Sequence, residues 1–180
     1  MKHLVFSLIL VIVPTVVAAC PNPPDHQSRL ADLTYQLSRS PNPVAAQPLT
    51  QEIWTLWLDA PDALAQQLLD QGMFQREAMD FAAARATLDQ LVQYCPTYAE
   101  GYNQRAFVSY LAQDFEAALV DLNRAIELVP NHIAALSGKG LTLMGLGRNA
   151  EADAAFRAAL ALNPWLAERR FLNQLPGTDI

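Results

Sequence analysis

Apolar side chains recur three and four residues apart along most of this chain, which is the period of an amphipathic α-helix. The segment 115–128, FEAALVDLNRAIEL, is an example of this spacing. Three segments of this kind are closed by a proline, as expected where a helix has to stop, and these prolines are Pro96, Pro130 and Pro164. The pattern predicts an all-α fold.

The three prolines lie 34 residues apart, and the residues before them fall into register in three copies. The shared positions are a small residue followed by apolar ones, held by Ala84, Ala118 and Ala152, by Leu88, Leu122 and Phe156, by Leu91, Ala125 and Ala159, and by Val92, Ile126 and Leu160. A fixed period of this length indicates stacked helix pairs, because one pair cannot bury its own apolar face.

This period, with its small alanines, bulky apolar residue and closing proline, resembles the tetratricopeptide repeat family over about residues 62–166. The family's small position in the first helix of each pair is held by Gly72, Ala106 and Gly140. The resemblance implies a right-handed superhelical solenoid of antiparallel helix pairs, with repeats at about 65–98, 99–132 and 133–166. It also implies a protein or peptide partner and no catalysis.

The arm at 20–61 is predicted to carry a further helix pair. Two apolar-periodic segments, 28–38 and 44–58, are separated by the turn Ser-Pro-Asn-Pro. Pro61 closes the second segment 35 residues before Pro96. We therefore interpret the arm as a degenerate fourth pair that caps the repeats.

Downstream of the third repeat, 165–175 is predicted to be a capping helix whose charged residues Glu168, Arg169 and Arg170 face solvent. This helix would complete a repeat domain over 62–175. Residues 176–180 are predicted to be a frayed tail.

The first 19 residues are predicted to be a secretory signal peptide. A short polar start is followed by the apolar run 4–13 and by small residues that end at Ala19. The apolar run is shorter than the ~20 residues that a membrane-spanning helix needs. The mature chain is therefore expected to be exported, most simply to a bacterial periplasm.

Cys20 and Cys95 are the two cysteines of the chain. Cys20 would be the first residue after cleavage, and oxidising compartments favour a disulfide between it and Cys95. The segment before Cys20, Val-Ala-Ala, also resembles the lipobox of bacterial lipoproteins, and an acylated Cys20 would anchor the chain to a membrane. Val17 in place of the lipobox leucine and Pro14 near the cut favour the disulfide, while lipidation and two free thiols remain alternatives.

Charge and motifs narrow the function further. The net charge of -6 leaves no basic stripe that could neutralise nucleic-acid phosphates. His26 and His132 have no metal-ligand partner at suitable spacing, and His132 is expected at the surface near a helix start. No sequence motif of a catalytic, metal or cofactor site is present, so we expect a non-enzymatic protein without cofactors.

The binding surface is expected on the concave face, which the first helix of each repeat lines. By resemblance, the residues that face the groove are Leu69, Met73 and Arg76 in the first repeat, Asn103, Phe107, Tyr110 and Leu111 in the second, and Ser137, Leu141 and Met144 in the third. Their apolar and aromatic centre suits an extended peptide or an amphipathic helix. The clamp by which some family members hold a C-terminal carboxylate is not evident, because Leu69 and Ser137 replace its key positions.

Overall fold

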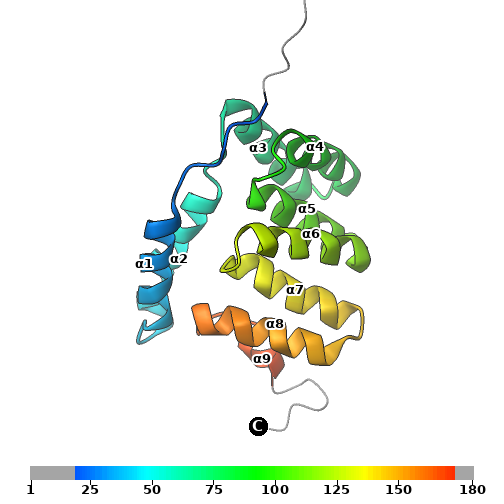
Figure 1. Cartoon of the computed structure of the whole chain (residues 1–180). Coiled ribbons are helices and arrows are strands. Elements are labelled where there is room, and N and C mark those ends of the chain that lie inside the picture. Colours follow the sequence, from blue (N-terminus) through cyan, green and yellow to red (C-terminus); the bar gives the residue numbers. More distant parts are fainter. Residues whose placement is uncertain (1–18, 173–180) are drawn as a thin grey trace, which may run out of the picture.

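The computed structural model describes residues 19–172, and every regular element in that range is an α-helix (Figure 1). The helices are α1 (Gln27–Ser38), α2 (Pro43–Trp57), α3 (Ala63–Glu77), α4 (Phe81–Tyr94), α5 (Ala99–Leu111), α6 (Phe115–Leu128), α7 (Ile133–Gly145), α8 (Asn149–Leu162) and α9 (Arg169–Leu172). Helices α3 to α8 form three antiparallel pairs that stack side by side. The all-helical repeat fold is thus confirmed.

Side chains at the helix starts satisfy backbone N–H groups that the first turn leaves without a helical partner. Asp62, Asp80 and Asp114 each accept a hydrogen bond from the N–H three residues on, at 2.8, 3.1 and 3.3 Å. His132 caps α7 in the same way, because its Nδ1 accepts from the N–H of Ala135 at 3.3 Å. These caps fix where α3, α4, α6 and α7 begin.

The two helices of each pair approach closely at the small position of the repeat. Gly72 of α3 faces Leu88 of α4, and an added Cβ would come 2.7 Å from the leucine side chain. Gly140 of α7 faces the fully buried ring of Phe156 in α8. A Cβ added at Gly140 would come closer to this ring than a Cβ at Gly72 would come to Leu88. In the second pair the same position is the buried Ala106. The 34-residue period of the sequence therefore reflects a packing requirement that each repeat meets with its own residues.

Helices α1 and α2, which we call the N-terminal hairpin, lie along one edge of the stack and not on its end (Figure 1). Leu33 and Ile53 of the hairpin share a core cluster with Ile133 of α7 and with Trp165, which follows α8. The indole N–H of Trp165 donates to the backbone oxygen of Ser40 at 3.0 Å. The predicted helix pair is present, but it does not stack on α3 as a fourth repeat, because its apolar face packs against the α7–α8 end.

The capping helix predicted at 165–175 begins later than expected in the structure. Residues 165–168 are not helical and α9 begins at Arg169, because Trp165 is held by the hairpin and its backbone N–H donates to the side chain of Asn163 at 3.0 Å. Phe171 of α9 still stacks on Phe156, with ring centroids 5.7 Å apart, so the last pair is covered. The predicted tail and the end of the predicted helix lie outside the described residues.

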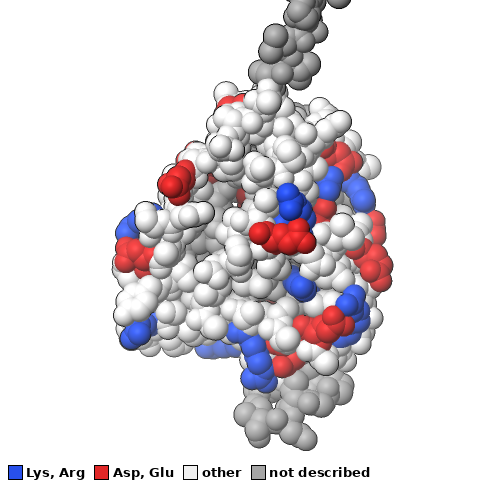
Figure 2. Space-filling model, viewed as in Figure 1, with Lys and Arg blue, Asp and Glu red and all other residues white. Residues whose placement is uncertain are grey.

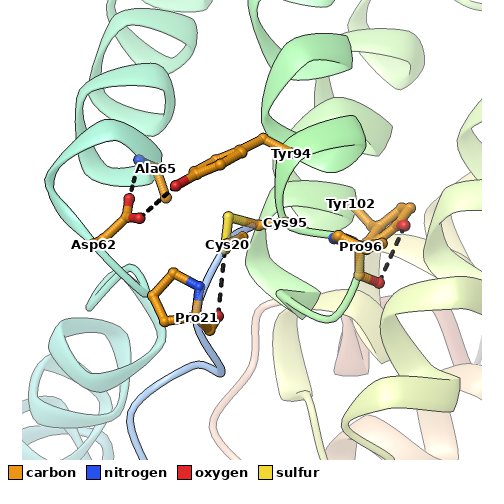
Figure 3. Close-up of a disulfide and its surroundings, with 8 residues drawn as sticks. All are labelled: Cys20, Pro21, Asp62, Ala65, Tyr94, Cys95, Pro96 and Tyr102. Atoms are coloured by element: carbon orange, nitrogen blue, oxygen red, sulfur yellow. Dashed lines mark hydrogen bonds between the residues drawn. A yellow bond between two sulfur atoms is a disulfide. The ribbon is translucent and has the colours of Figure 1, made fainter. Parts of the chain in front are cut away.

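Cys20 and Cys95 are joined by a disulfide whose Cα atoms are 5.1 Å apart (Figure 3). Cys95 is buried at the C-terminal end of α4, so the bond ties the N-terminal arm to the first repeat. Except for Ala19, the predicted signal peptide lies outside the described residues. Among residues 19–172, no helix combines the length and the apolarity that a membrane crossing requires.

Candidate protein-binding surface

The ten residues predicted to bind a partner belong to α3, α5 and α7, which line the side of the stack that we call the groove face. Phe107 and Leu111 of α5 are exposed on it. The guanidinium carbon of Arg76 in α3 lies 4.9 Å from the centre of the Phe107 ring, and Arg76 also donates a hydrogen bond to Gln104. A cation over an aromatic face is attracted by the ring's charge distribution. Phe107, Leu111 and Arg76 therefore form a fixed amphipathic patch, named the Phe107 patch below.

Four further predicted residues are half-buried, namely Met73, Tyr110, Leu141 and Met144. Met73 packs against the core cluster of the first pair, and Leu141 and Met144 pack against that of the third. The Tyr110 ring lies 5.6 Å from the ring of Phe115. These side chains support the neighbouring core and present part of their surface beside the Phe107 patch.

The remaining three predicted residues, Leu69, Asn103 and Ser137, are buried. Leu69 belongs to the core cluster of the first pair, which also contains Leu88 and Leu91 of α4. The amide of Asn103 donates to both carboxylate oxygens of Glu100 at 3.2 Å. The structure thus places these three side chains inside the protein, where a partner does not reach them.

A buried polar network joins the starts of α5 and α7. The Glu100 carboxylate accepts hydrogen bonds from Asn103, from Gln104 at 2.5 Å and from His132 at 2.9 Å. Since Nδ1 of His132 accepts the capping bond from Ala135, its proton sits on Nε2 and points at Glu100. His132 was expected at the surface, and this expectation was wrong, because its side chain is fully buried.

Trp57 of α2 closes this network from the hairpin side. Its ring stacks on the His132 ring with centroids 4.1 Å apart and planes inclined by 14°. The hydroxyl of Tyr98 donates to the backbone oxygen of Trp57 at 2.8 Å. Burial raises the pKa of Tyr98, and the nearby carboxylates of Glu100 and Asp59 raise it further. Tyr98 and His132 occupy the same position in consecutive repeats, so one tryptophan holds the hairpin to two repeats.

A cavity of about 510 Å³ separates the hairpin from the edge of the stack, and Figure 2 shows the surface hollowed there. Trp57, Tyr98 and His132 contribute to its lining. The charged residues that line it are acidic, namely Asp25, Asp59 and Glu100, and His26 bonds to Asp59 at 2.7 Å. The cavity therefore disfavours anionic ligands. Within residues 19–172, no group of three or more His, Cys, Asp or Glu side chains is arranged to hold a metal ion.

Models of the tetratricopeptide repeat match residues 68–98 and 133–164, which fall on the first and third helix pairs. These two helix pairs are tetratricopeptide repeats. A TPR repeat-containing protein of Rhizobium etli is 28% identical over 150 residues, which are 83% of this chain and 68% of that protein. A tetratricopeptide repeat protein 36 homolog of Nematostella vectensis is 43% identical over 65 residues, 36% of either protein.

Solved structures of tetratricopeptide repeat proteins share this fold. The TPR2B domain of yeast Sti1, in a complex with pHsp70, has a TM-score of 0.58 and 23% identity over 63% of this chain and 93% of that one. The first TPR of Spaghetti (RPAP3), bound to the HSP90 peptide SRMEEVD, has a TM-score of 0.58 and 22% identity over 62% and 86%. The MamA RS-1 ArsTM double mutant has a TM-score of 0.53 and 17% identity over 79% and 78%. At these identities the likeness establishes the fold alone.

This tetratricopeptide repeat chain does not present an exposed carboxylate clamp on its groove face. Leu69 and Ser137 are buried, and the Asn103 amide is bound by Glu100. The amide that the second repeat directs inward is thus bound within the protein itself. What the groove face exposes is the apolar and cationic surface of the Phe107 patch.

Proposed function

We propose that this chain is a non-catalytic protein-interaction module of the bacterial cell envelope, which binds a peptide or an amphipathic helix on its groove face. The exposed Phe107 patch is the observation that carries the proposal. Exposed aromatic residues that are already held in place lose little side-chain entropy on binding, so they suit an anchor position. Peptide binding by TPR domains of the same fold, those of yeast Sti1 and RPAP3, supports a ligand of this class.

The ligand that this surface favours differs from the carboxylate-ended peptides that a polar clamp would hold. Phe107 and Leu111 of α5 offer apolar contact, and the half-buried Met73 lies in α3, the corresponding helix of the first repeat. Methionine adapts its shape to irregular apolar partners. Arg76 adds one positive charge at the edge of this surface. We therefore propose an apolar ligand segment, with an acidic residue beside the apolar anchor.

Export is part of the proposal, and the cysteines support it. A disulfide between Cys20 and Cys95 is typical of oxidising compartments. A lipid on Cys20 would use the same sulfur as this disulfide, so the bond disfavours the lipid-anchored alternative. Intact mass of the chain purified from its own envelope distinguishes the two. For a chain that begins at Cys20, a mass two hydrogen atoms below that of the reduced form supports the disulfide, and an added acyl mass contradicts it.

A role as an accessory enzyme subunit is the other candidate, and the Glu100–His132 pair is the feature that brings it forward. Both side chains are buried. The Glu100 carboxylate and both ring nitrogens of His132 already have hydrogen-bond partners within the protein. Trp57 covers the histidine ring. The pair is therefore suited to holding the hairpin and not to meeting a substrate.

The groove face can be tested by capturing partners from the native envelope after light cross-linking. The chain with Phe107→Ala and Leu111→Ala should lose the specific partners while keeping its helical circular dichroism. Val120→Ala is the matched control, because Val120 is an exposed apolar residue of α6 outside the groove face. Partners that stay bound to the double variant would contradict the groove assignment.

A further inference from the structure

The face of α3 that points away from the rest of the stack is unlike the same face of α5 and α7. Four residues form it, and we call them the α3 end face: Leu64, Gln67, Gln71 and Phe74. One repeat later the same positions are Tyr98, Gly101, Arg105 and Val108, and two repeats later they are His132, Ala135, Lys139 and Thr142. These equivalent positions show how the same face of a repeat is covered inside the molecule.

In the second and third repeats the preceding helix pair covers these positions. Val108 is 1% exposed and Thr142 is 0% exposed, whereas the equivalent Phe74 is 71% exposed. A Cβ added to Gly101 would meet Leu91 of α4 at 3.3 Å, which shows how closely α4 packs there. The α3 end face is therefore a repeat-packing surface without the preceding pair that buries its counterparts.

The N-terminal hairpin precedes α3 in the chain, but it is committed elsewhere. Its apolar residues Ile53 and Trp57 pack in the cluster at the edge of the stack, against Ile133 of α7. Trp57 is also fixed by its contact with His132. Within residues 19–172, the hairpin does not fill the position of a fourth repeat.

The chemistry of the α3 end face suits a second copy of this chain. In the second repeat Arg105 pairs with Asp89 of the preceding α4 at 2.7 Å, but the equivalent Gln71 is uncharged. Leu64, Gln67 and Phe74 are uncharged as well. Two copies can bring this face together without like-charge repulsion, although each chain carries a net charge of -6. Amide side chains can donate and accept, so Gln71 can pair with its own counterpart.

The other end of the stack determines which symmetry a pair of chains can adopt. There, Phe171 of α9 stacks on Phe156 of α8, so the surface that would receive a further repeat is covered. Head-to-tail stacking needs two different free ends, whereas a two-fold contact needs one self-complementary face. We propose that a second copy of this chain packs on the α3 end face, α3 against α3 across a two-fold axis. This interface goes beyond the proposed function and leaves the groove face free.

Sedimentation equilibrium of the purified, disulfide-bonded chain, from low micromolar to submillimolar concentration, tests this dimer. Phe74→Glu should weaken the dimer by about tenfold or more, because it buries an unpaired charge at the contact. Val120→Glu is the matched control, since Val120 is 68% exposed on α6, and it should leave the dissociation constant unchanged.

A charge exchange at Gln71 tests the two-fold axis itself. Gln71→Arg and Gln71→Glu should each weaken self-association, and an equal mixture of the two variants should restore it. A chain that is monomeric at every concentration overturns the proposal, as does a dimer that Phe74→Glu leaves intact or a mixture that associates no better than its components. The groove ligand is measured separately, so either proposal can fail without the other.

Discussion

Trp57 lies flat on His132, although Trp57 ends α2 and His132 caps the start of α7, far along the chain. The stacked rings are 4.1 Å apart between centroids, and the histidine is fully buried beneath the tryptophan. Its other polar contacts are the capping bond from Ala135 and the bond to Glu100. The hairpin is therefore held in part by one aromatic contact, which is made over a polar network inside the repeats.

Trp57→Ala should detach the hairpin while the repeat stack stays folded. Truncation of a buried tryptophan costs ~3–5 kcal/mol, and here that loss falls on the hairpin contact. Hydrogen exchange should accelerate in α1 and α2 and change little in α5 to α8. Tyr35→Ala is the control, because Tyr35 is exposed on α1 and should leave the exchange pattern as it was. Equal acceleration in all helices would show that the hairpin and the stack unfold together.

The Cys20–Cys95 bond should stabilise the whole fold. It links residues separated by 75 positions, so it restricts the unfolded chain strongly, and a loss of ~2–4 kcal/mol is expected on reduction. Urea unfolding with and without reductant measures the difference in free energy of unfolding. Cys20→Ser should match the reduced protein and should not respond to reductant. A reduced chain as stable as the oxidised one would mean that the arm is already ordered without the bond.

The stack of helix pairs could be predicted from the sequence because each repeat carries its own packing requirement. Small residues such as Ala118 and Gly140 face a bulky residue of the paired helix, and Pro130 follows a finished helix. These contacts are local, so they repeat every 34 residues and are visible without the structure.

The place of the hairpin could not be predicted in this way. The apolar stripe that contains Ile53 and Trp57 predicts that one face of the helix is buried, but it does not predict the surface against which that face packs. The partner surface is formed by Ile133, His132 and Trp165, which are distant in sequence and follow no motif. For the same reason the burial of His132 and of Leu69 was not predicted.

Asp62 should make the stability of the fold depend on acid pH. The N–H of Ala65 and the hydroxyl of Tyr94 donate to its carboxylate at 2.8 and 2.6 Å, and these bonds hold the pKa of Asp62 below its usual value (Figure 3). Because the folded pKa is the lower one, the stabilisation is complete above the ordinary aspartate pKa of about 3.9. It is lost as the pH falls through the folded value.

Asp62→Asn isolates the charge, because asparagine can still cap α3. Wild type and variant should differ in free energy of unfolding at neutral pH and converge in acid, which urea titrations at several pH values measure. Tyr94→Phe should show the same convergence with a smaller difference at neutral pH. A difference that stays constant with pH would assign the effect to the cap and not to the charge.

Gly140→Ala should destabilise the third helix pair. The added Cβ would enter the space of the buried Phe156 ring, and overpacking of this kind costs ~1–3 kcal/mol. That cost is larger than the ~1 kcal/mol by which alanine improves on glycine in a helix. Gly138→Ala is the comparison in the same helix, because its Cβ would meet the Leu122 side chain at 3.1 Å, a longer distance than that from Gly140 to the Phe156 ring. In thermal unfolding, the midpoint temperature of Gly138→Ala should equal or exceed that of the wild type, and the midpoint of Gly140→Ala should be lower.

The turn inside each helix pair has one residue in the left-handed region, with φ of 63° at Met79, 61° at Gln113 and 72° at Gly147. A side chain in that region costs ~1–2 kcal/mol. The extra freedom of glycine in the unfolded chain offsets ~0.4–1 kcal/mol of this. Because Met79 is exposed and has little packing to lose, Met79→Gly should raise the free energy of unfolding by up to ~1 kcal/mol.

Gly147→Ala is the reverse experiment at the matching turn. No atom lies within 4 Å of the added Cβ, so the backbone angle opposes the substitution and steric contact does not. It should lower the free energy of unfolding by about the amount that Met79→Gly raises it. Urea unfolding of both variants gives the two numbers. If neither changes stability, the left-handed backbone at these two positions does not limit the stability of the fold.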